Sequence, residues 1–272
     1  MPDTTVVPTY DFDAVAAWTS YDMPEFHSWG VYGAEVAAPR LLDLHDRHGI
    51  PATWFVPGHT IESFPGVCGD VWDRGYEIQH HGWSHESPAS FESREAERRD
   101  LVRGIESIED LTGRAPTGYR TPDGGFSPDT VELLEEHGFE WDSSDSQHDT
   151  TPYRLRKDWS APVDEPYDPG VETDIVEIPY VWHRDDWMQI FPVVSGPEWV
   201  AYSTEPAVFD RWLAEVEWMH EHVDDGVFTL LLHPQCAGRI PFLRRLDDFF
   251  TTLEAMDGVE FADAGTVAEA VD

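Results

Sequence analysis

The sequence predicts one α/β domain over residues 1–272, built around a closed or nearly closed barrel of about eight parallel strands. Short apolar runs of strand length alternate with longer stretches of helical spacing, and repeated βα units of this kind form parallel sheets. No Gly/Ser-rich linker divides the 272 residues, and 40% hydrophobic with 13% aromatic residues is ample for a large core. About eight units favour a barrel over a small open sheet.

Turn residues mark where the predicted elements end. The helix that follows the first strand keeps its apolar residues on or near one stripe until Gly49 stops it, and Gly75 stops the next helix. Strands are predicted at 6–12, 51–56, 76–80, 117–120, 139–142, 175–179, 227–232 and 259–262. Helices are predicted at 35–48, 61–74, 92–111, 128–137, 206–222 and 242–255, with a last helix from residue 266. Two Pro- and Asp-rich segments, 151–173 and 192–206, are predicted to be long loops, which in such a barrel commonly carry substrate contacts.

The charge of the chain is strongly acidic. It has 54 Asp and Glu against 17 Lys and Arg, a formal net charge of −37, and Lys157 is its one lysine. A field of this sign repels nucleic acid and anionic membrane surfaces, so neither is expected as a partner. Acidic residues spread over the whole sequence indicate adaptation to a salt-rich cytoplasm, where short screening lengths weaken the repulsion. We therefore hypothesise a halophilic source.

The expected compartment is the cytoplasm. No apolar run approaches the roughly 20 residues that span a bilayer, and the first residues lack a basic segment followed by an apolar one. The two cysteines, Cys68 and Cys236, lie far apart and outside any CxxC pair, so buried free thiols are expected rather than a disulfide or a cysteine-ligated zinc. The many aromatic residues are compatible with a homo-oligomer.

The run HHGWSHES, residues 80–87, directly follows a predicted strand and indicates a metal site. It places His81 and His85 four residues apart around a glycine, and zinc prefers imidazole and carboxylate ligands. The alternative is that these are surface or hydrogen-bonded core residues, since the chain has 13 histidines. His80 lies on the opposite face of its strand and is expected to be structural.

Further polar residues stand at the ends of other predicted strands, where a parallel barrel carries its chemistry. Asp11 and Asp13 end the first strand, and alternate residues of a strand point to the same face. Taken singly, these residues have structural explanations such as a turn carboxylate, a surface ion pair or a capping histidine. Their joint placement at five strand ends indicates one site. The set consists of Asp11, Asp13, His81, His85, Arg120, Asp142 and His233.

Five segments in this order resemble the motifs of a known family. TYDFDA, HGWSH, YRTPDGG, WDSSD and LLHPQ, between residues 9 and 235, are similar to the five motifs of the polysaccharide deacetylases, also called the NodB-type or carbohydrate esterase family 4 enzymes. The DFDA and HPQCAGRI forms look closest to a cytoplasmic branch that includes peptidoglycan-deacetylase-like proteins, cyclic imide hydrolases and allantoinase-like enzymes. The resemblance implies a distorted (β/α) barrel of about seven to eight parallel strands and hydrolysis of an amide C–N bond.

The resemblance also implies roles for the clustered residues. By position, Asp13, His81 and His85 match the metal ligands, Asp11 the general base, Arg120 the arginine that holds this base, Asp142 the motif-four aspartate, and His233 the general acid. Two imidazoles and a carboxylate leave a divalent metal, zinc above all, with open positions for water and a substrate carbonyl. A backbone N–H near Asp123 is expected to help stabilise the oxyanion, and Asp142 is expected to keep His233 charged.

The chain departs from the family pattern at two places, and its fourth motif offers two aspartates. Phe12 separates two aspartates that are adjacent in the family, which leaves open which of Asp11 and Asp13 binds metal and which takes the proton. Asp123 stands where an aromatic residue usually follows the proline, and this changes the mouth of the pocket. In the fourth motif Asp145 is the alternative to Asp142, which is favoured because it closely follows the apolar Phe139 and Trp141 at a strand end.

The substrate stays open at this stage. Trp29, Trp182 and Trp187 form either a lid over a small substrate or a platform for a sugar ring, or else belong to the core or an interface. Most members of the family act on N-acetylated sugars, whereas small cyclic amides such as imides or ureides fit a cytoplasmic enzyme better. A third hypothesis is a barrel that binds metal or carbohydrate without catalysis. The presence of both proton-transfer residues, Asp11 and His233, disfavours it.

Overall fold

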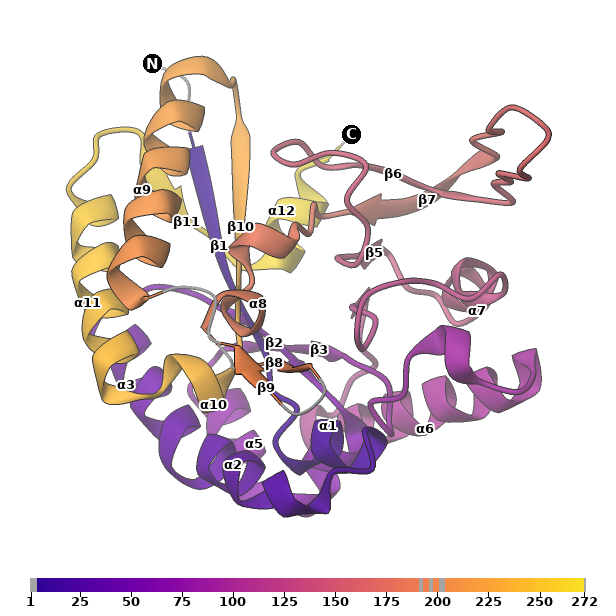
Figure 1. Ribbon diagram of the computed structural model, residues 1–272, viewed down its shortest axis with the longest axis horizontal. Helices are drawn as coiled ribbons and strands as arrows, with labels where there is room; N and C mark the ends of the chain where they lie inside the picture. Colours follow the sequence, from indigo (N-terminus) through magenta and orange to yellow (C-terminus); the bar gives the residue numbers. More distant parts are fainter. Residues whose placement is uncertain (1–3, 191–192, 196–197, 201–203, 272) are drawn as a thin grey trace.

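A curved sheet of nine strands forms the centre of the protein in our computed structural model, which describes residues 4–190, 193–195, 198–200 and 204–271. The strand order is β10-β1-β2-β3-β4-β5-β7-β6, and β11 also pairs with β1 (Figure 1). All pairs are parallel except β6 with β7. The strands are β1 (Thr4–Asp11), β2 (Thr53–Val56), β3 (Glu77–His80), β4 (Gly118–Tyr119), β5 (Trp141–Asp142), β6 (Tyr153–Lys157), β7 (Val171–Glu177), β10 (Gly226–Leu232) and β11 (Val259–Phe261).

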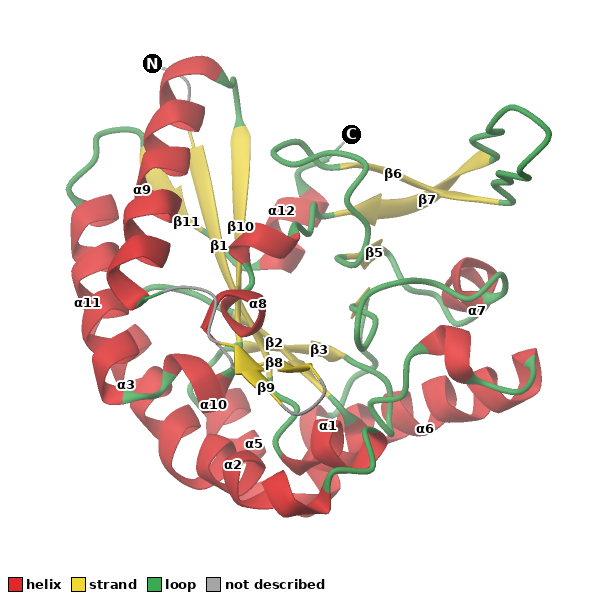
Figure 2. Ribbon diagram, viewed as in Figure 1, coloured by secondary structure: helices red, strands yellow, loops and turns green. Residues whose placement is uncertain are grey.

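The chain also forms helices, most of which lie around the outer side of this sheet (Figure 2). They are α1 (Val15–Ser20), η1 (Pro24–Phe26), α2 (His27–Tyr32), the π-helix η2 (Gly33–Ala37), α3 (Ala38–His48), α4 (Gly58–Ser63), α5 (Pro65–Asp73), η3 (Pro88–Ser90), α6 (Arg94–Thr112), α7 (Thr130–Glu136), η4 (Trp182–Arg184), α8 (Asp186–Ile190), α9 (Glu205–His222), α10 (Pro234–Ala237), α11 (Ile240–Glu254) and α12 (Ala264–Glu269). A separate two-stranded sheet pairs β8 (Val193–Ser195) with β9 (Glu198–Val200).

Three hydrophobic clusters hold the sheet and the helices together. The largest cluster packs α3, α9 and α11 against β1, β2 and β10, and includes Tyr10 stacked on Trp54 with ring centroids 4.5 Å apart. Successive residues of β1 join different clusters, Val6 the outer one and Val7 the inner one, as the alternation of side chains in a strand requires. Each such side chain contributes roughly 1.5–3 kcal/mol of burial free energy.

The register of β1 decides where polar side chains meet. Tyr10 lies opposite Leu232 of β10 and opposite Trp54 of β2, so the chain that leaves β1 at Asp11 runs beside the chain that leaves β10 at His233. β3 ends at His80, level with Val56 of β2. The carboxyl ends of these strands therefore open onto one space, which agrees with the placement of chemistry in parallel barrels.

The predicted α/β barrel is confirmed, as a curled and open sheet. Within the described residues its two edges are β10 and β6, so the sheet forms a half-barrel rather than a closed ring. The predicted helix 61–74 is two helices, because the residue before Pro65 is forced out of helical geometry. Residues 15–34, for which no element was predicted, are largely helical.

The predicted loop 151–173 was wrong in part, because it contains β6 and the start of β7. These strands form an antiparallel arm that projects from the body of the protein (Figure 1). Of the second predicted loop, 192–206, residues 192, 196–197 and 201–203 lie outside the described residues, and β8 and β9 occupy part of the rest. Cys68 and Cys236 are free and buried, as predicted. Among the described helices, none combines the length and apolarity that a bilayer crossing requires.

Candidate active site

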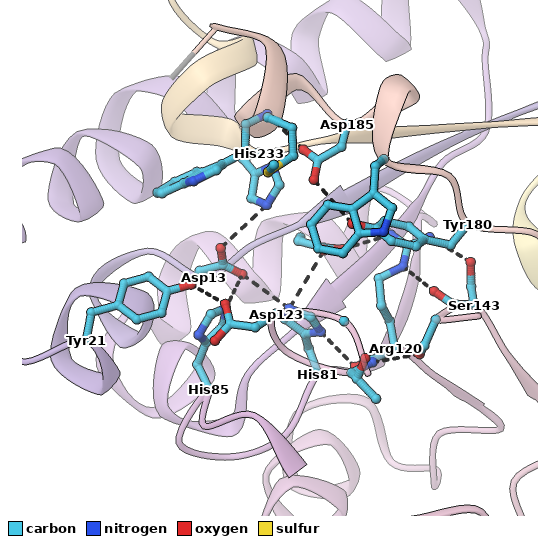
Figure 3. Close-up of a pocket in the computed structure, with 17 residues that line it drawn as sticks. Asp13, Tyr21, His81, His85, Arg120, Asp123, Ser143, Tyr180, Asp185 and His233 are labelled. Carbon is cyan, nitrogen blue, oxygen red and sulfur yellow. Dashed lines mark hydrogen bonds and ion pairs between the residues drawn. The ribbon is translucent and has the colours of Figure 1, made fainter. Parts of the chain in front are cut away.

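A cavity of about 130 Å³ opens at the carboxyl ends of the strands (Figure 3). It brings together nine of the eleven predicted site residues: Asp11, Asp13, His81, His85, Arg120, Asp123, Trp182, Trp187 and His233. Asp142 and Trp29 do not line it. Residues from β1, from the segments after β3 and β4, and from the end of β10 therefore meet in one place, as the sequence predicted.

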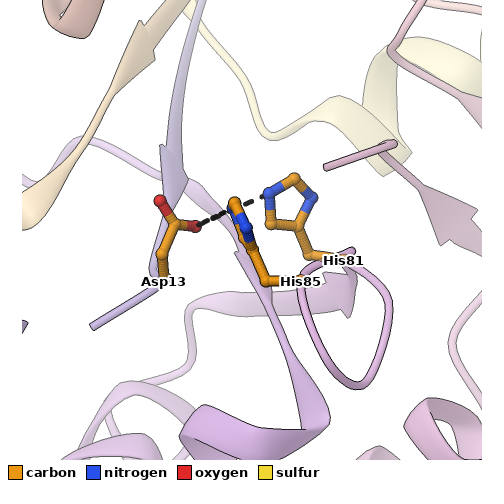
Figure 4. Close-up of side chains that lie close together, drawn as sticks. All are labelled: Asp13, His81 and His85. Atoms are coloured by element: carbon orange, nitrogen blue, oxygen red, sulfur yellow. Dashed lines mark ion pairs between the residues drawn. The ribbon is translucent and has the colours of Figure 1, made fainter. Parts of the chain in front are cut away.

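Asp13, His81 and His85 converge on a common point (Figure 4). Asp13 Oδ1 lies 3.5 Å from His81 Nε2 and 3.5 Å from His85 Nε2, and all three residues are buried. Ligand atoms around a four-coordinate ion with bonds of 2.0–2.1 Å stand about 3.3 Å apart. Asp13 Oδ1 is also a buried acceptor without a hydrogen-bond partner among the described residues. The donor set and its spacing therefore fit a divalent metal.

The outer nitrogens of both histidines are held so that Nε2 faces Asp13. His81 Nδ1 lies 2.8 Å from the carbonyl oxygen of Arg120, and His85 Nδ1 lies 3.3 Å from Ser20 Oγ. Ser20 donates its own proton to Ala17 O, so it accepts from His85. Such contacts fix the tautomer that leaves Nε2 free to bind metal. Burial lowers the pKa of His81 to about 3, which keeps this imidazole neutral.

A strained turn delivers Asp13 to this point. Ala14 has φ 48° and ψ −122°, a conformation that residues with a side chain rarely adopt, and His85 has φ 61°. Gly30 of α2 packs directly on this turn: a Cβ atom built on Gly30 would lie 2.4 Å from Ala14 O. Glycine at position 30 therefore lets α2 approach closely enough to support the residue that follows Asp13.

Gly30→Ala is expected to lower the free energy of unfolding by about 1–3 kcal/mol, because the added methyl group forces α2 and the Ala14 turn apart. Metal affinity is expected to fall with it, since Asp13 is displaced. Denaturant unfolding and metal titration measure the two effects. Gly66→Ala is the control, because a Cβ there meets nothing within 4 Å. Equal behaviour of the two variants would contradict the role given to Gly30.

Asp11 lies beside the triad and is held by Arg120. Arg120 Nη1 donates to Asp11 Oδ1 at 2.8 Å, and its other nitrogens donate to Ser143 O and Ser143 Oγ, both at 2.8 Å. The guanidinium also lies 4.0 Å from the centre of the Phe55 ring. Asp11 Oδ2 is left facing His81 Nε2 at 3.8 Å. The carboxylate is thus fixed through one oxygen, and the other is directed at the triad.

His233 pairs with Asp186. The prediction that Asp142 holds His233 was wrong. Asp186 Oδ1 lies 2.8 Å from His233 Nδ1, and the same carboxylate accepts the backbone N–H of His233 at 3.0 Å. Asp185 Oδ1 is 3.6 Å from His233 Nδ1. Burial opposes a charge on His233, but the hydrogen bond to Asp186 and the charges of Asp185 and Asp186 outweigh it and raise its pKa to about 10. His233 Nε2 lies 3.9 Å from Asp13 Oδ2.

Asp142 turns away from the cavity onto its own strand end. It accepts hydrogen bonds from Ser144 N at 2.8 Å and Ser144 Oγ at 2.9 Å, and it lies opposite Glu177 in the pairing of β5 with β7. Glu177 also accepts from Ser144 N and Asp145 N. Burial, then the charge of Asp142, raises the pKa of Glu177 well above its ordinary value, so this carboxyl group keeps its proton to higher pH than a free glutamic acid.

Glu177→Gln is expected to remove one source of pH dependence in stability. The pKa of Glu177 is raised in the folded protein, so unfolding releases its proton and folding stability falls as pH rises above about 4.5, by up to about 1.4 kcal/mol per pH unit. Glutamine reproduces the protonated acid at every pH. Unfolding of both proteins between pH 5 and 8 should show a difference that grows in favour of the variant. A constant difference would indicate that Glu177 is ionised when folded.

Aromatic residues surround the mouth of the cavity. Trp182 is 50% exposed, while Trp187 contacts His233 with ring centroids 5.2 Å apart. Tyr180 donates a hydrogen bond to Asp185 Oδ2 at 3.3 Å. Trp29, predicted to contact substrate, instead packs with Trp18 and Phe26 around α1 and α2, because helices that the sequence did not reveal carry it outside the cavity. His80 lies outside the cavity too, with Nε2 2.9 Å from Leu101 O.

The sequence analysis missed Asp185, Asp186, Tyr21 and Tyr180. The signal for the first two was present, since two adjacent aspartates stand between tryptophans in the segment 182–187. They reach His233 because Asp185 pairs with Leu231 beyond the edge of β10, a contact between parts of the chain 46 residues apart. Tyr21 follows a helix that carries no clear periodic pattern.

Comparisons with known proteins give the same family as the motifs. The profile of the polysaccharide deacetylases matches residues 22–141. The peptidoglycan deacetylase of Helicobacter pylori is 35% identical over 95% of this chain and 93% of its own length, and a peptidoglycan deacetylase-like protein of Gibberella zeae is 32% identical over 86% and 75%.

Solved structures support the fold and the family. A protein of Mycobacterium smegmatis, described as a polysaccharide deacetylase, superposes with a TM-score of 0.85 at 32% identity, over 99% of this chain and 90% of its own. The allantoinase PuuE shares the fold alone, with a TM-score of 0.76 at 20% identity over 98% of this chain and 88% of its own. Because relatives above 30% identity align over nearly the whole chain, this protein belongs to the polysaccharide deacetylase family.

Proposed function

We propose that residues 1–272 form one catalytic domain, a metal-dependent hydrolase that removes an acyl group from an N-acetylated sugar by cleaving its amide C–N bond. Asp13, His81 and His85 are the proposed metal ligands, Asp11 the base and His233 the acid. The observation that carries the proposal is the position of Asp13 Oδ1. This oxygen lies 3.5 Å from both imidazole Nε2 atoms and has no hydrogen-bond partner among the described residues. Zinc is the proposed ion because it prefers nitrogen donors combined with a carboxylate.

The proposed mechanism divides proton transfer between two fixed groups. The metal, when bound, makes water more acidic and polarises the substrate carbonyl. Asp11, oriented by Arg120, accepts the proton of the attacking water through Oδ2. His233, kept protonated by Asp186, donates to the departing nitrogen through Nε2. The backbone N–H of Asp123 is proposed to stabilise the negative charge that develops on the carbonyl oxygen.

Two observations bear on the substrate. An N-acetylated sugar is supported by the 35% identity to a peptidoglycan deacetylase and by the exposed Trp182, since an aromatic ring at a pocket mouth offers a flat surface for a sugar. A small cyclic amide is the second candidate, because a cavity of about 130 Å³ enclosed by Tyr21, Tyr180 and Trp187 suits a compact ring. The two free thiols are compatible with the cytoplasmic location that we propose.

A panel of amides distinguishes these candidates. The metal-loaded protein is assayed in high salt against N-acetylglucosamine oligomers, cyclic imides and allantoin. Release of acetate from the oligomers is expected. Turnover of cyclic imides alone would reject the deacetylase, and bound metal without any turnover would indicate a metal-binding barrel that lacks catalysis.

We also propose that the protein is adapted to high salt, on the strength of its net charge of −37. At about 0.1 M ionic strength charges act over roughly 10 Å, and at 1 M over roughly 3 Å, so added salt relieves the repulsion. The free energy of unfolding is expected to rise between 0.1 M and multimolar KCl. Stability independent of KCl would reject a halophilic source.

A homo-oligomer is proposed on the basis of the β6–β7 arm. Four of the nine large hydrophobic residues exposed on the described surface lie on it, namely Trp159, Val163, Tyr167 and Val171. Clustered exposed apolar residues commonly mark an interface. Light scattering is expected to show an assembly for the wild type and a monomer for the double variant Trp159→Ser/Tyr167→Ser. Trp218→Ser, at an exposed tryptophan on α9, is the control.

A further inference from the structure

Asp123 is the carboxylate at the cavity mouth that has no cationic partner. Its one hydrogen-bond donor is the neutral phenol of Tyr21, and it takes part in no ion pair within the described part of the chain. The other carboxylates of the cavity lie close to cations or imidazoles: Asp11 to Arg120, Asp13 to His81 and His85, and Asp185 to His233. An incoming substrate therefore meets a carboxylate that no cation pairs with within the described residues.

The Asp123 carboxylate is held in place by the geometry around it. Asp123 has φ 61° and precedes Gly124 with φ 65°, so the turn after β4 is fixed in the left-handed region, which aspartate and asparagine tolerate better than most residues. Tyr21 reaches across the mouth from the end of α1 and also packs edge-on against His85, with ring centroids 5.9 Å apart (Figure 3). The hydroxyl of Tyr21 donates its hydrogen bond to Asp123 Oδ1 and so orients this carboxylate.

We propose that Asp123, held by Tyr21, selects the substrates of this site: its carboxylate accepts a hydrogen bond from an O–H or N–H group of a neutral amide and repels amides that carry a carboxylate nearby. This inference rests on the proposed function, because it concerns the same cavity. A hydroxyl beside an acetamido group, or a ring N–H beside a cyclic amide, supplies the donor. A carboxylate in the same place meets a like charge at short range.

The test uses two hydroxamates that differ in charge. Acetohydroxamic acid is neutral, and succinic monohydroxamic acid adds one carboxylate to the same group that binds metal. Calorimetry gives the Kd of each for the zinc-loaded full chain, as the wild type and as Asp123→Asn, Tyr21→Phe and Asp22→Asn. Asp22 is the matched control, because it is also exposed, has φ 54°, and lies outside the cavity. Asparagine tolerates the same backbone conformation, so Asp123→Asn is expected to fold.

The wild type is expected to bind the neutral hydroxamate more tightly than the anionic one. Asp123→Asn is expected to reduce this preference by about tenfold, since one charge repulsion of more than 1.4 kcal/mol at an effective dielectric near 20 is removed. Asp22→Asn should keep the preference. Tyr21→Phe should reduce the preference less than Asp123→Asn does, because the charge remains while the hydrogen bond that orients it is lost.

An unchanged preference in Asp123→Asn, with acetohydroxamic acid still bound, would overturn the inference and leave the proposed function intact. A loss of preference in Asp22→Asn as large as in Asp123→Asn would also overturn it, because the effect would then belong to the net charge of the surface. Failure of the zinc-loaded wild type to bind either hydroxamate would overturn both the proposed function and the inference built on it.

Discussion

Replacing Asp11 by asparagine is expected to lower kcat for amide hydrolysis by about 10²–10⁴, the range typical of a lost general base. Asparagine keeps an oxygen that accepts from Arg120, so the contact at Oδ1 survives and only the proton acceptor disappears. Metal content is expected to stay as in the wild type. Steady-state kinetics with metal analysis of the same sample measures both, and Asp145→Asn is the control because it lies outside the cavity.

The same variant tests which of the two aspartates in the first motif binds the metal and which accepts the proton. If Asp11 were the metal ligand and Asp13 the base, Asp11→Asn would lose metal while Asp13→Asn retained it. The structure favours the opposite, because Asp13 Oδ1 is equidistant from both imidazoles and Asp11 is already neutralised by Arg120. Retained metal with undiminished turnover would remove Asp11 from the mechanism.

Asp186→Asn is expected to lower kcat by about 10² or more, because the negative charge beside His233 Nδ1 that keeps His233 protonated is removed. The loss should depend on the substrate. An amide whose nitrogen leaves easily needs less help from an acid, so the defect should shrink for an N-acyl aniline that carries electron-withdrawing groups. A plot of kcat against leaving-group pKa for wild type and variant measures this.

Asp142→Asn is the comparison for that experiment. Asp142 contacts Ser144 and Glu177 rather than His233, so its replacement is expected to change stability more than kcat and to leave the dependence on the leaving group unaltered. A larger and leaving-group-dependent defect in Asp142→Asn than in Asp186→Asn would restore the role that the sequence assigned to Asp142.

The order of strands and helices could be predicted because periodic apolar runs and glycine stops are local signals. β6 could not, since Arg154, Arg156 and Lys157 make it a polar edge strand without an apolar run. Residues 15–37 form several short helices that pack around Trp18, and none is long enough to show a helical period. The sequence likewise could not predict whether the sheet closes into a barrel, because closure depends on which strands pair at the two edges of the sheet.

The candidate site, like the fold, could be predicted only in part from the sequence. Asp11, Asp13, His81, His85, Arg120 and His233 stand at or near strand ends, so their meeting follows from the topology. The position of Asp186, the partner of His233, does not follow from the topology. Asp186 belongs to a short helix that a single bridge beside β10 brings into position. Asp142 satisfied the strand-end rule, but its strand has two residues and its carboxylate caps the turn that follows.

Metal content is the most direct test of the central claim, which is that Asp13, His81 and His85 form the ligand set of an amide hydrolase. Elemental analysis of the purified protein, before and after chelation and in the variants His81→Ala and His85→Ala, is read beside amide turnover. We expect one divalent ion per chain in the wild type, its loss in both variants, and turnover that chelation abolishes and zinc restores. Full turnover by a chelated protein free of metal would contradict the account.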